Sequence, residues 1–355
     1  MKIEAVDLFC GAGGLTCGLR ASGIKVSAGV DVEEACRFPF EQNHPGARFY
    51  AKDVAALHAD ELRKLWRNRG GAIRLLAGCA PCQPFSSYTR TSLTTRHEKW
   101  GLLEEFARLV KETQPELVTM ENVPGLEREE PFSIFLKALA DAHYKFDHAV
   151  VNCADYGVPQ QRRRLVLVAS RLGPISLPEP TNRGPGQWIS VREAVAGLPR
   201  IGAGEAHESD PLHRAAKLSD LNLQRIRVAK EGGTWRDWPE DLVAQCHRRD
   251  SGKNSAGVYG RMRWDQPAPT MTTLCYGFGN GRFGHPEQDR AISLREAAIF
   301  QSFPPDYCFV DKKGVIPMKR VSRWIGNAVP PKLGEAVGRV LVAHVKRYYA
   351  GAPVA

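Results

Sequence analysis

Short apolar segments alternate with amphipathic segments over roughly the first half of the chain, and this alternation restricts the possible folds more than any other feature. Apolar segments typical of strands lie at residues 3–9, 25–30, 73–77, 117–120, 146–151 and 165–169. Segments typical of helices lie at residues 15–21, 33–43, 102–112 and 132–143. Because helices that separate strands act as crossover connections, the pattern predicts an α/β protein with a doubly wound, mainly parallel sheet.

The alternation ends after Arg171, where prolines and glycines become frequent. Residues 172–284 are loop-rich and mildly basic, with scattered tryptophans, which indicates a separate irregular module. Helical patterns return at residues 293–301, which open with a capping-box pattern, and at residues 331–348. We therefore predict one domain made of residues 1–171 and 285–355, and a second, smaller, loop-rich domain made of residues 172–284.

Composition excludes several classes of protein. Hydrophobic residues make up 43% of the 355 residues and charged residues 25%, which is typical of a globular chain. The formal net charge of +10 is compatible with a polyanionic partner. No apolar run reaches the length of a membrane span, and the N-terminus does not resemble a secretory signal. Nine cysteines without framework spacing favour a reducing compartment, so we expect a cytoplasmic protein without a membrane partner.

The first apolar segment runs directly into a glycine cluster at residues 11–14. A strand that meets glycines and then a helix lets the backbone approach a ligand at the carboxyl edge of the sheet. Asp31 ends the second apolar segment, where its carboxylate could bond ribose hydroxyls, and Asp53 could meet an adenine amino group. Thr16 replaces the last glycine of the dinucleotide pattern, which disfavours a pyrophosphate cofactor. The features together favour a nucleoside cofactor, although tight turns with solvated acids are an alternative for each one.

Cys79 and Cys82 form a C-x-x-C pair directly after a predicted strand. A zinc site would need two further ligands, and the other cysteines are isolated in the sequence. A redox pair normally opens a helix, whereas Pro84 and the serines that follow it prolong a loop here. We therefore interpret Cys82 as a nucleophilic thiol at the sheet edge and Cys79 as a small core residue.

Glu121 follows the predicted strand at residues 117–120. A carboxylic acid near a thiol suits attack on an electron-poor ring whose nitrogen is protonated as the new bond forms. Such pairs also recur by chance, so the two residues alone leave the reaction open.

Six motifs in sequence order resemble those of the cytosine-5 DNA methyltransferases, over nearly the whole chain. They lie at residues 7–15 (DLFCGAGGL), 81–86 (PCQPFS), 121–123 (ENV), 160–165 (QQRRRL), 294–304 (LREAAIFQSFP) and 326–331 (GNAVPP). The resemblance implies a DNA (cytosine-5-)-methyltransferase of the bacterial restriction-modification type, with the class I S-adenosylmethionine-dependent methyltransferase fold. It implies duplex DNA as substrate and S-adenosylhomocysteine as the product of the methyl donor.

The resemblance also implies a role for individual residues. Cys82 would add to C6 of a flipped-out cytosine, Glu121 would bond N3 and the exocyclic amine, and Arg164 would hold O2 with Arg162 nearby. The methyl-donor pocket would be lined by Phe9, Gly11, Gly13, Gly14, Leu15, Asp31, Val32, Asp53, Pro81, Leu102, Asn327 and Val329. DNA contacts would come from Gln83, Ser86, Arg90 and Arg96, and no metal is implied.

Two positions depart from the family pattern. Trp100 precedes Gly101 where relatives often have an arginine, and Val32 stands where relatives can stack an aromatic ring on adenine. The loop at residues 88–99 resembles the mobile loop that closes over DNA, but a plain surface loop is an equal alternative. Residues 162–164 could likewise contact phosphates or form a solvated face.

Two other functions remain to be compared with DNA methylation. A catalytically silent DNA-binding relative would lack the thiol or the acid, and both are present here. An RNA cytosine-5 methyltransferase would carry the same thiol and acid, but the sizeable module at residues 172–284 favours duplex DNA. We expect a monomer, with a restriction endonuclease as a possible cellular partner. The bases that are recognised cannot be predicted from linear spacing.

Overall fold

A computed structural model describes residues 2–67, 71–81, 96–249, 257–311 and 314–351, and only the backbone of residues 96–100. The chain divides into two compact units, which we call the sheet unit and the irregular unit. The sheet unit comprises Met1–Tyr156, Arg163–Thr181 and Val329–Ala355, and the irregular unit comprises Gly157–Arg162 and Asn182–Ala328. Residues 285–328 thus pack with the irregular unit, whereas we assigned them to the first domain. Which part recognises the DNA target stays a prediction.

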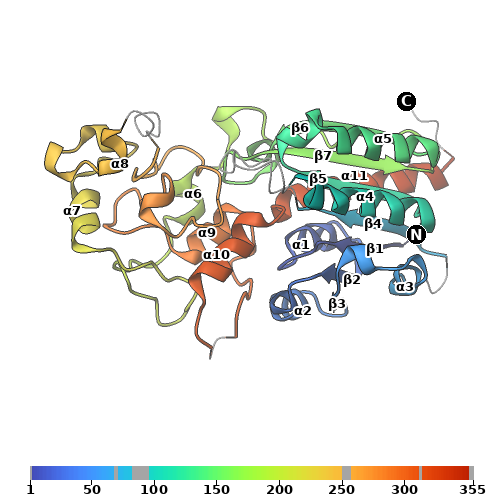
Figure 1. The fold of residues 1–355 in the computed structure, drawn as a ribbon, viewed down its shortest axis with the longest axis horizontal. Helices are drawn as coiled ribbons and strands as arrows, with labels where there is room; N and C mark the ends of the chain where they lie inside the picture. Colours follow the sequence, from blue (N-terminus) through green and yellow to red (C-terminus); the bar gives the residue numbers. More distant parts are fainter. Residues whose placement is uncertain (1, 68–70, 82–95, 250–256, 312–313, 352–355) are drawn as a thin grey trace. The chain divides into compact units, whose positions relative to one another are not determined.

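The sheet unit is built on seven strands in the order β3-β2-β1-β4-β5-β7-β6 (Figure 1). The strands are β1 (Ile3–Leu8), β2 (Lys25–Asp31), β3 (Arg48–Ala51), β4 (Ile73–Gly78), β5 (Leu117–Asn122), β6 (Lys145–Asn152) and β7 (Arg163–Ser170). β1 to β5 pair in parallel, while β7 runs antiparallel to both β5 and β6. The predicted fold class, a doubly wound and mainly parallel sheet, is confirmed, and its antiparallel edge is a common variation.

Helices cover both faces of this sheet. They are α1 (Gly14–Ala21), α2 (Arg37–Asn43), α3 (Ala59–Leu65), α4 (Arg96–Thr113), α5 (Glu130–Asp141) and α11 (Pro331–Tyr349). Side chains of α3, α4 and α5 share one apolar core with the sheet, in which the rings of Phe106 and Phe135 lie 5.3 Å apart. On the other face α1 packs against α11, the last helix of the chain. Both faces of the sheet are therefore buried, which explains why its strands are almost continuously apolar.

Gly18 allows α1 and α11 to pack with their backbones in contact. A Cβ atom at Gly18 would lie 2.2 Å from the carbonyl oxygen of Pro331, which is too close for any side chain. Pro331 begins α11, a position where proline costs no helical hydrogen bond. The predicted C-terminal helix is confirmed, and this contact fixes it to the sheet unit.

The irregular unit contains short helices joined by long ordered loops. Its helices are α6 (Val191–Val195), α7 (Asp220–Val228), α8 (Gln245–Arg248), α9 (Leu294–Phe300) and α10 (Met318–Asn327). Ser293 and Glu296 form the predicted capping box at the start of α9. Burial raises the pKa of Glu296, but the paired Arg290 guanidinium outweighs burial and lowers it to about 2.

Buried arginine side chains hold the loops of this unit together by hydrogen bonds to backbone carbonyl oxygens. Arg261 is 4% exposed and donates hydrogen bonds to the carbonyl oxygens of Ile226, Ala229, His285 and Gln288. Bonds of this kind satisfy loop carbonyls that a helix or sheet would otherwise satisfy. Within the described residues, no helix is long and apolar enough to cross a membrane.

Candidate active site

The loop after β1 has an unusual backbone at the carboxyl edge of the sheet. Phe9 has a φ of 57° and Gly13 a φ of 92°, both in the left-handed region. For Phe9 this conformation is strained, and such strain is concentrated at functional sites. The loop is tied to the neighbouring strand, because the Gly11 N–H donates to Asp31 Oδ2 at 2.9 Å.

The partner of Thr16, which lies in the first turn of α1 where the dinucleotide pattern has its last glycine, is Asp7. Asp7 lies at 1% exposure in β1, and the Thr16 hydroxyl donates to its Oδ2 at 2.7 Å. Burial raises the pKa of Asp7 to about 7, even though the bond from Thr16 lowers it. The threonine therefore stabilises a buried acid, and its presence does not by itself indicate a ligand.

The edge formed by β1, β2 and β3 fits a nucleoside. Asp31 accepts N–H groups from Gly11 and Glu33, one on each carboxyl oxygen, so lone pairs remain for hydroxyl groups. Burial is the largest influence on Asp31 and raises its pKa above the ordinary value. A Cβ atom at Gly11 would meet no atom within 4 Å, so the space beside the loop is open.

The other predicted donor-pocket residues are distributed as follows. Val32 is 74% exposed, and Asp53 is exposed with Oδ1 accepting the Ala55 N–H at 3.0 Å. Pro81 is exposed and Leu102 is half-buried. Gly14, Leu15 and Val329 are buried in the sheet unit, whereas Asn327 belongs to the irregular unit.

Glu121 lies at the carboxyl end of β5 and is 5% exposed. Its Oε2 accepts a hydrogen bond from Cys79 Sγ at 3.0 Å, and its Oε1 lies 2.9 Å from Arg164 Nε. Oε1 nevertheless receives no hydrogen bond from the described residues, since the Arg164 N–H is not directed at it. A buried carboxylate oxygen without a donor is costly, so this atom is a candidate to meet a ligand.

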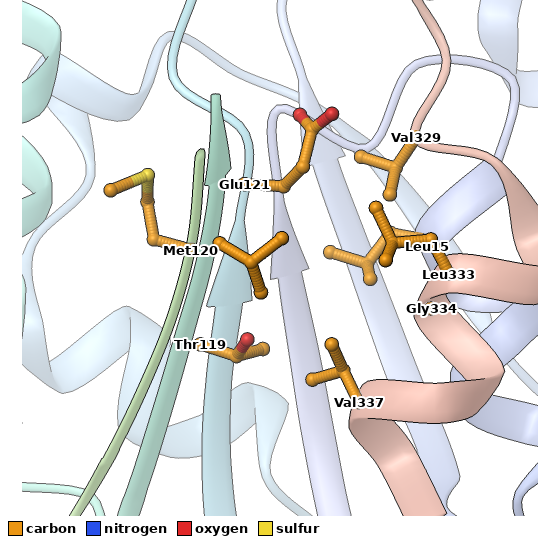
Figure 2. Close-up of a pocket in the computed structure, with 9 residues that line it drawn as sticks. Leu15, Thr119, Met120, Glu121, Val329, Leu333, Gly334 and Val337 are labelled. Atoms are coloured by element: carbon orange, nitrogen blue, oxygen red, sulfur yellow. The ribbon is translucent and has the colours of Figure 1, made fainter. Parts of the chain in front are cut away.

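The surroundings of Glu121 separate its polar end from an apolar cavity. Figure 2 shows the carboxyl group turned away from a small cavity lined by Leu15, Leu333 and Val337, among others. Beside it, Asn122 Nδ2 donates to the carbonyl oxygen of Ala80 at 3.0 Å. Asn122 thus fastens the segment that leads to Cys82, a role that we did not predict from the acid motif.

Cys79 does not lie in the core, where we predicted it. It is half-buried, and its thiol donates a hydrogen bond to Glu121. The interpretation as a small core residue was therefore wrong. The sequence placed Cys79 directly after a strand, but the register that brings it level with Glu121 is seen only in the structure.

The two predicted arginines lie in different units. Arg162 is 2% exposed and belongs to the irregular unit, where it donates to the carbonyl oxygens of Met271 and Gly326 at 2.9 and 2.8 Å. Arg164 belongs to the sheet unit and faces Glu121, while Arg163 between them is exposed. Arg162 therefore holds the backbone of the 326–331 motif, and its catalytic role stays a prediction.

Several predicted residues fall outside the described part of the chain. These are Cys82, Gln83, Ser86 and Arg90, together with most of the loop at residues 88–99. The expectation of a loop was wrong for residues 96–99, because α4 already begins at Arg96. Among the described thiols, burial raises the pKa of Cys275 to about 11 and that of Cys10 well above its ordinary value, so neither suits a nucleophile.

The sheet topology and the residues at the carboxyl edge of the sheet place this chain in the class of doubly wound α/β proteins. Proteins of this class bind their ligands at the carboxyl ends of the strands. Residues 3–343 match the family model of the C-5 cytosine-specific DNA methylases, and the chain belongs to this family. It is a cytosine-5 DNA methyltransferase, and the family depends on S-adenosylmethionine. The family resemblance of the six motifs is thereby confirmed.

Individual relatives support the assignment along the whole chain. The type II methylase M.HgiDII of Herpetosiphon aurantiacus is 48% identical over 98% of this chain and 96% of its own length. The type II methyltransferase M1.HphI of Haemophilus parahaemolyticus is 32% identical over 96% of this chain and 87% of its own.

Solved structures share the fold at low sequence identity. A putative DNA modification methyltransferase encoded within an Escherichia coli prophage covers 97% of this chain and 100% of its own, with a TM-score of 0.71 and 22% identity. The Dnmt2 methyltransferase of S. pombe covers 98% of this chain and 99% of its own, with a TM-score of 0.64 and 15% identity.

Proposed function

We propose that this chain is a type II modification enzyme that methylates C5 of a cytosine within a specific short duplex DNA sequence. Two relatives that span almost the whole chain are named type II methylase or methyltransferase. The observation that carries the proposal is the buried pair of Glu121 and Arg164, in which Oε1 of the acid lacks a hydrogen bond from the described residues. This pair suits a cytosine ring, which offers a nitrogen, an amine and a carbonyl oxygen along one edge.

In the proposed reaction the Cys82 thiolate adds its electron pair to C6 of cytosine. The electrons of the C5–C6 double bond move into the ring, where Glu121 supplies a proton to N3 and Arg164 holds O2. C5 then takes up the methyl group and loses its proton to water. Those electrons restore the double bond and expel Cys82 as a thiolate, and N3 returns its proton to Glu121, so the enzyme is regenerated.

The target atoms are hidden inside a stacked duplex, so the base has to leave the helix first. Methyltransferases are among the enzymes that extrude a nucleotide into their site in this way. Glu121 is buried in the sheet unit at 5% exposure, so its carboxyl group can be reached by a single base more readily than by an intact duplex.

S-adenosylmethionine supplies the methyl group as an electrophile and leaves as S-adenosylhomocysteine. Asp31 would accept the ribose hydroxyls, and Asp53 would accept the adenine amine through the lone pairs that its turn leaves free. The open backbone at Gly11 would let the donor approach closely.

The irregular unit supplies groups for a polyanion. On α10 one face is buried and the other carries Lys319, Arg320 and Arg323, all exposed. We infer that these side chains bind DNA, together with the predicted contacts Gln83, Ser86, Arg90 and Arg96. Contacts to the phosphates would fix the position of the protein along the duplex. A restriction endonuclease of the same specificity would be the expected cellular partner.

Incorporation of labelled methyl groups tests the proposal directly. Duplex DNA should be labelled in the presence of S-adenosylmethionine while transfer RNA is not, and bisulfite sequencing should place the label in one short sequence. Cys82→Ser should abolish labelling, because a hydroxyl is a far weaker nucleophile than a thiolate. Cys153→Ser, which changes a buried thiol far along the chain, is the matched control. Labelling of transfer RNA alone, or full activity of Cys82→Ser, would overturn the proposal.

A further inference from the structure

The register of the sheet places Cys79 beside Glu121. β4 and β5 pair in parallel with Gly78 opposite Met120, so Cys79, the first residue after β4, comes level with Glu121 in β5. Side chains at the same level of neighbouring strands project from the same face of a sheet. The thiol of Cys79 thereby reaches the carboxyl group and donates to Oε2 at 3.0 Å.

The carboxyl group of Glu121 is held differently on its two sides. Arg164 Nε lies 2.9 Å from Oε1, but its N–H is not directed at that oxygen. This contact is therefore an ion pair without a hydrogen bond. The bond from Cys79 is directional and lies on the opposite oxygen. Among the described residues, the thiol thus gives this carboxyl group a directional side-chain hydrogen bond, and the guanidinium contributes its positive charge.

We propose that Cys79 is a positioning residue for methyl transfer, whose S–H holds Oε2 of Glu121 so that Oε1 and the free lone pair of Oε2 face the target cytosine. The inference rests on the proposed function, in which Glu121 bonds N3 and the exocyclic amine. Each carboxyl oxygen has more than one acceptor position, so Oε2 can keep the bond from the thiol while it also accepts the exocyclic amine of the base. A thiol is a weak and neutral donor, which orients Glu121 without taking up the proton that the acid gives to N3.

Kinetics separate this role from simple packing. Cys79→Ala removes the donor and should lower the single-turnover rate of methylation about fivefold, the factor that corresponds to one modest hydrogen bond. KM for duplex DNA should stay within about twofold, because Cys79 acts on the acid and not on the binding surface. Cys79→Ser restores a donor at nearly the same place and should recover most of the rate. A rate of Cys79→Ala equal to that of the wild type, or a serine variant as slow as the alanine variant, would overturn the proposal.

A double-mutant cycle tests whether the effect passes through Glu121. In a Glu121→Ala background, Cys79→Ala should cause no further loss of rate, since the group that it positions is gone. Cys153→Ala, which also removes a buried thiol from the sheet unit, should leave the rate unchanged in both backgrounds. An equal loss from Cys79→Ala in both backgrounds would contradict a positioning role.

Infrared spectroscopy tests the hydrogen bond without any turnover. The S–H stretching band of Cys79 is isolated by subtracting the spectrum of Cys79→Ala from that of the wild type. It should lie at a lower frequency in the wild type than in Glu121→Ala, because the acceptor is lost in the variant. An unchanged band would overturn the proposal. If the wild type fails to methylate DNA while the band still shifts, the proposed function fails and the Cys79–Glu121 bond stands.

Discussion

At the scale of single residues, the buried carboxyl group of Asp7 in β1 makes the stability of the sheet unit depend on pH. The pKa of Asp7 is raised from 3.8 to about 7, chiefly by burial, so the folded chain keeps a proton that the unfolded chain releases. Between these values each rise in pH favours the unfolded state, and above about pH 7 the full cost applies. That cost is on the order of 4 kcal/mol for a shift of this size.

Asp7→Asn should remove most of this pH dependence. The free energy of unfolding, measured with urea between about pH 4 and about pH 8, should fall with pH in the wild type and much less in the variant. Absolute stability is a poorer readout, because the new amide brings its own donors. Asp60→Asn, at an exposed carboxylate on α3, is the control and should keep the wild-type slope. An identical slope in Asp7→Asn would show that Asp7 is ionised in the folded state.

At the scale of elements, α1 near the start of the chain packs closely against α11 near its end. At Gly18 a Cβ atom would lie 2.2 Å from Pro331 O and 2.6 Å from Glu335 N, both backbone atoms of α11. Gly101 is also a helical glycine, in α4, but a Cβ atom there would meet no atom within 4 Å. An added methyl group at Gly18 therefore tests steric crowding between helices, whereas one at Gly101 tests helix propensity alone.

The two alanine variants should change stability in opposite directions. Gly18→Ala should cost about 1–3 kcal/mol or more, because the helices have to move apart. Gly101→Ala should add about 1 kcal/mol, because alanine favours the helix more than glycine does. Urea unfolding of both variants measures the difference. Equal shifts of the same sign would contradict the described packing of α1 on α11.

Elements with a strong apolar pattern could be predicted from the sequence, and weakly patterned ones could not. The six predicted strands are all present, because burial on both faces leaves a nearly continuous apolar run. β3 was missed, since Phe49 is its one buried residue and an edge strand needs few apolar side chains. α10 was also missed, although Val321, Trp324 and Ile325 follow a helical spacing, because a helix of ten residues with one apolar face gives only a short pattern.

At the scale of the whole molecule, the family and its motifs could be identified from the sequence, but the partners of each side chain could not. Glu121 was predicted from its motif, whereas its bond to Cys79 depends on the register between β4 and β5. Arg162 and Arg164 are two residues apart in the sequence, yet they belong to different units and contact different groups. Packing between distant segments decides such contacts, and linear spacing does not encode it.

The central claim is that Cys82 bonds covalently to C6 of the target cytosine, and a mechanism-based trap tests it most directly. A duplex with 5-fluorocytosine at the methylated position, incubated with the enzyme and S-adenosylmethionine, should yield a stable protein–DNA conjugate, because fluorine cannot leave C5 as a proton does. Peptide mapping should place the bond at Cys82. The account is contradicted if no conjugate forms under conditions in which the unmodified duplex is methylated, or if the bond maps to Cys79.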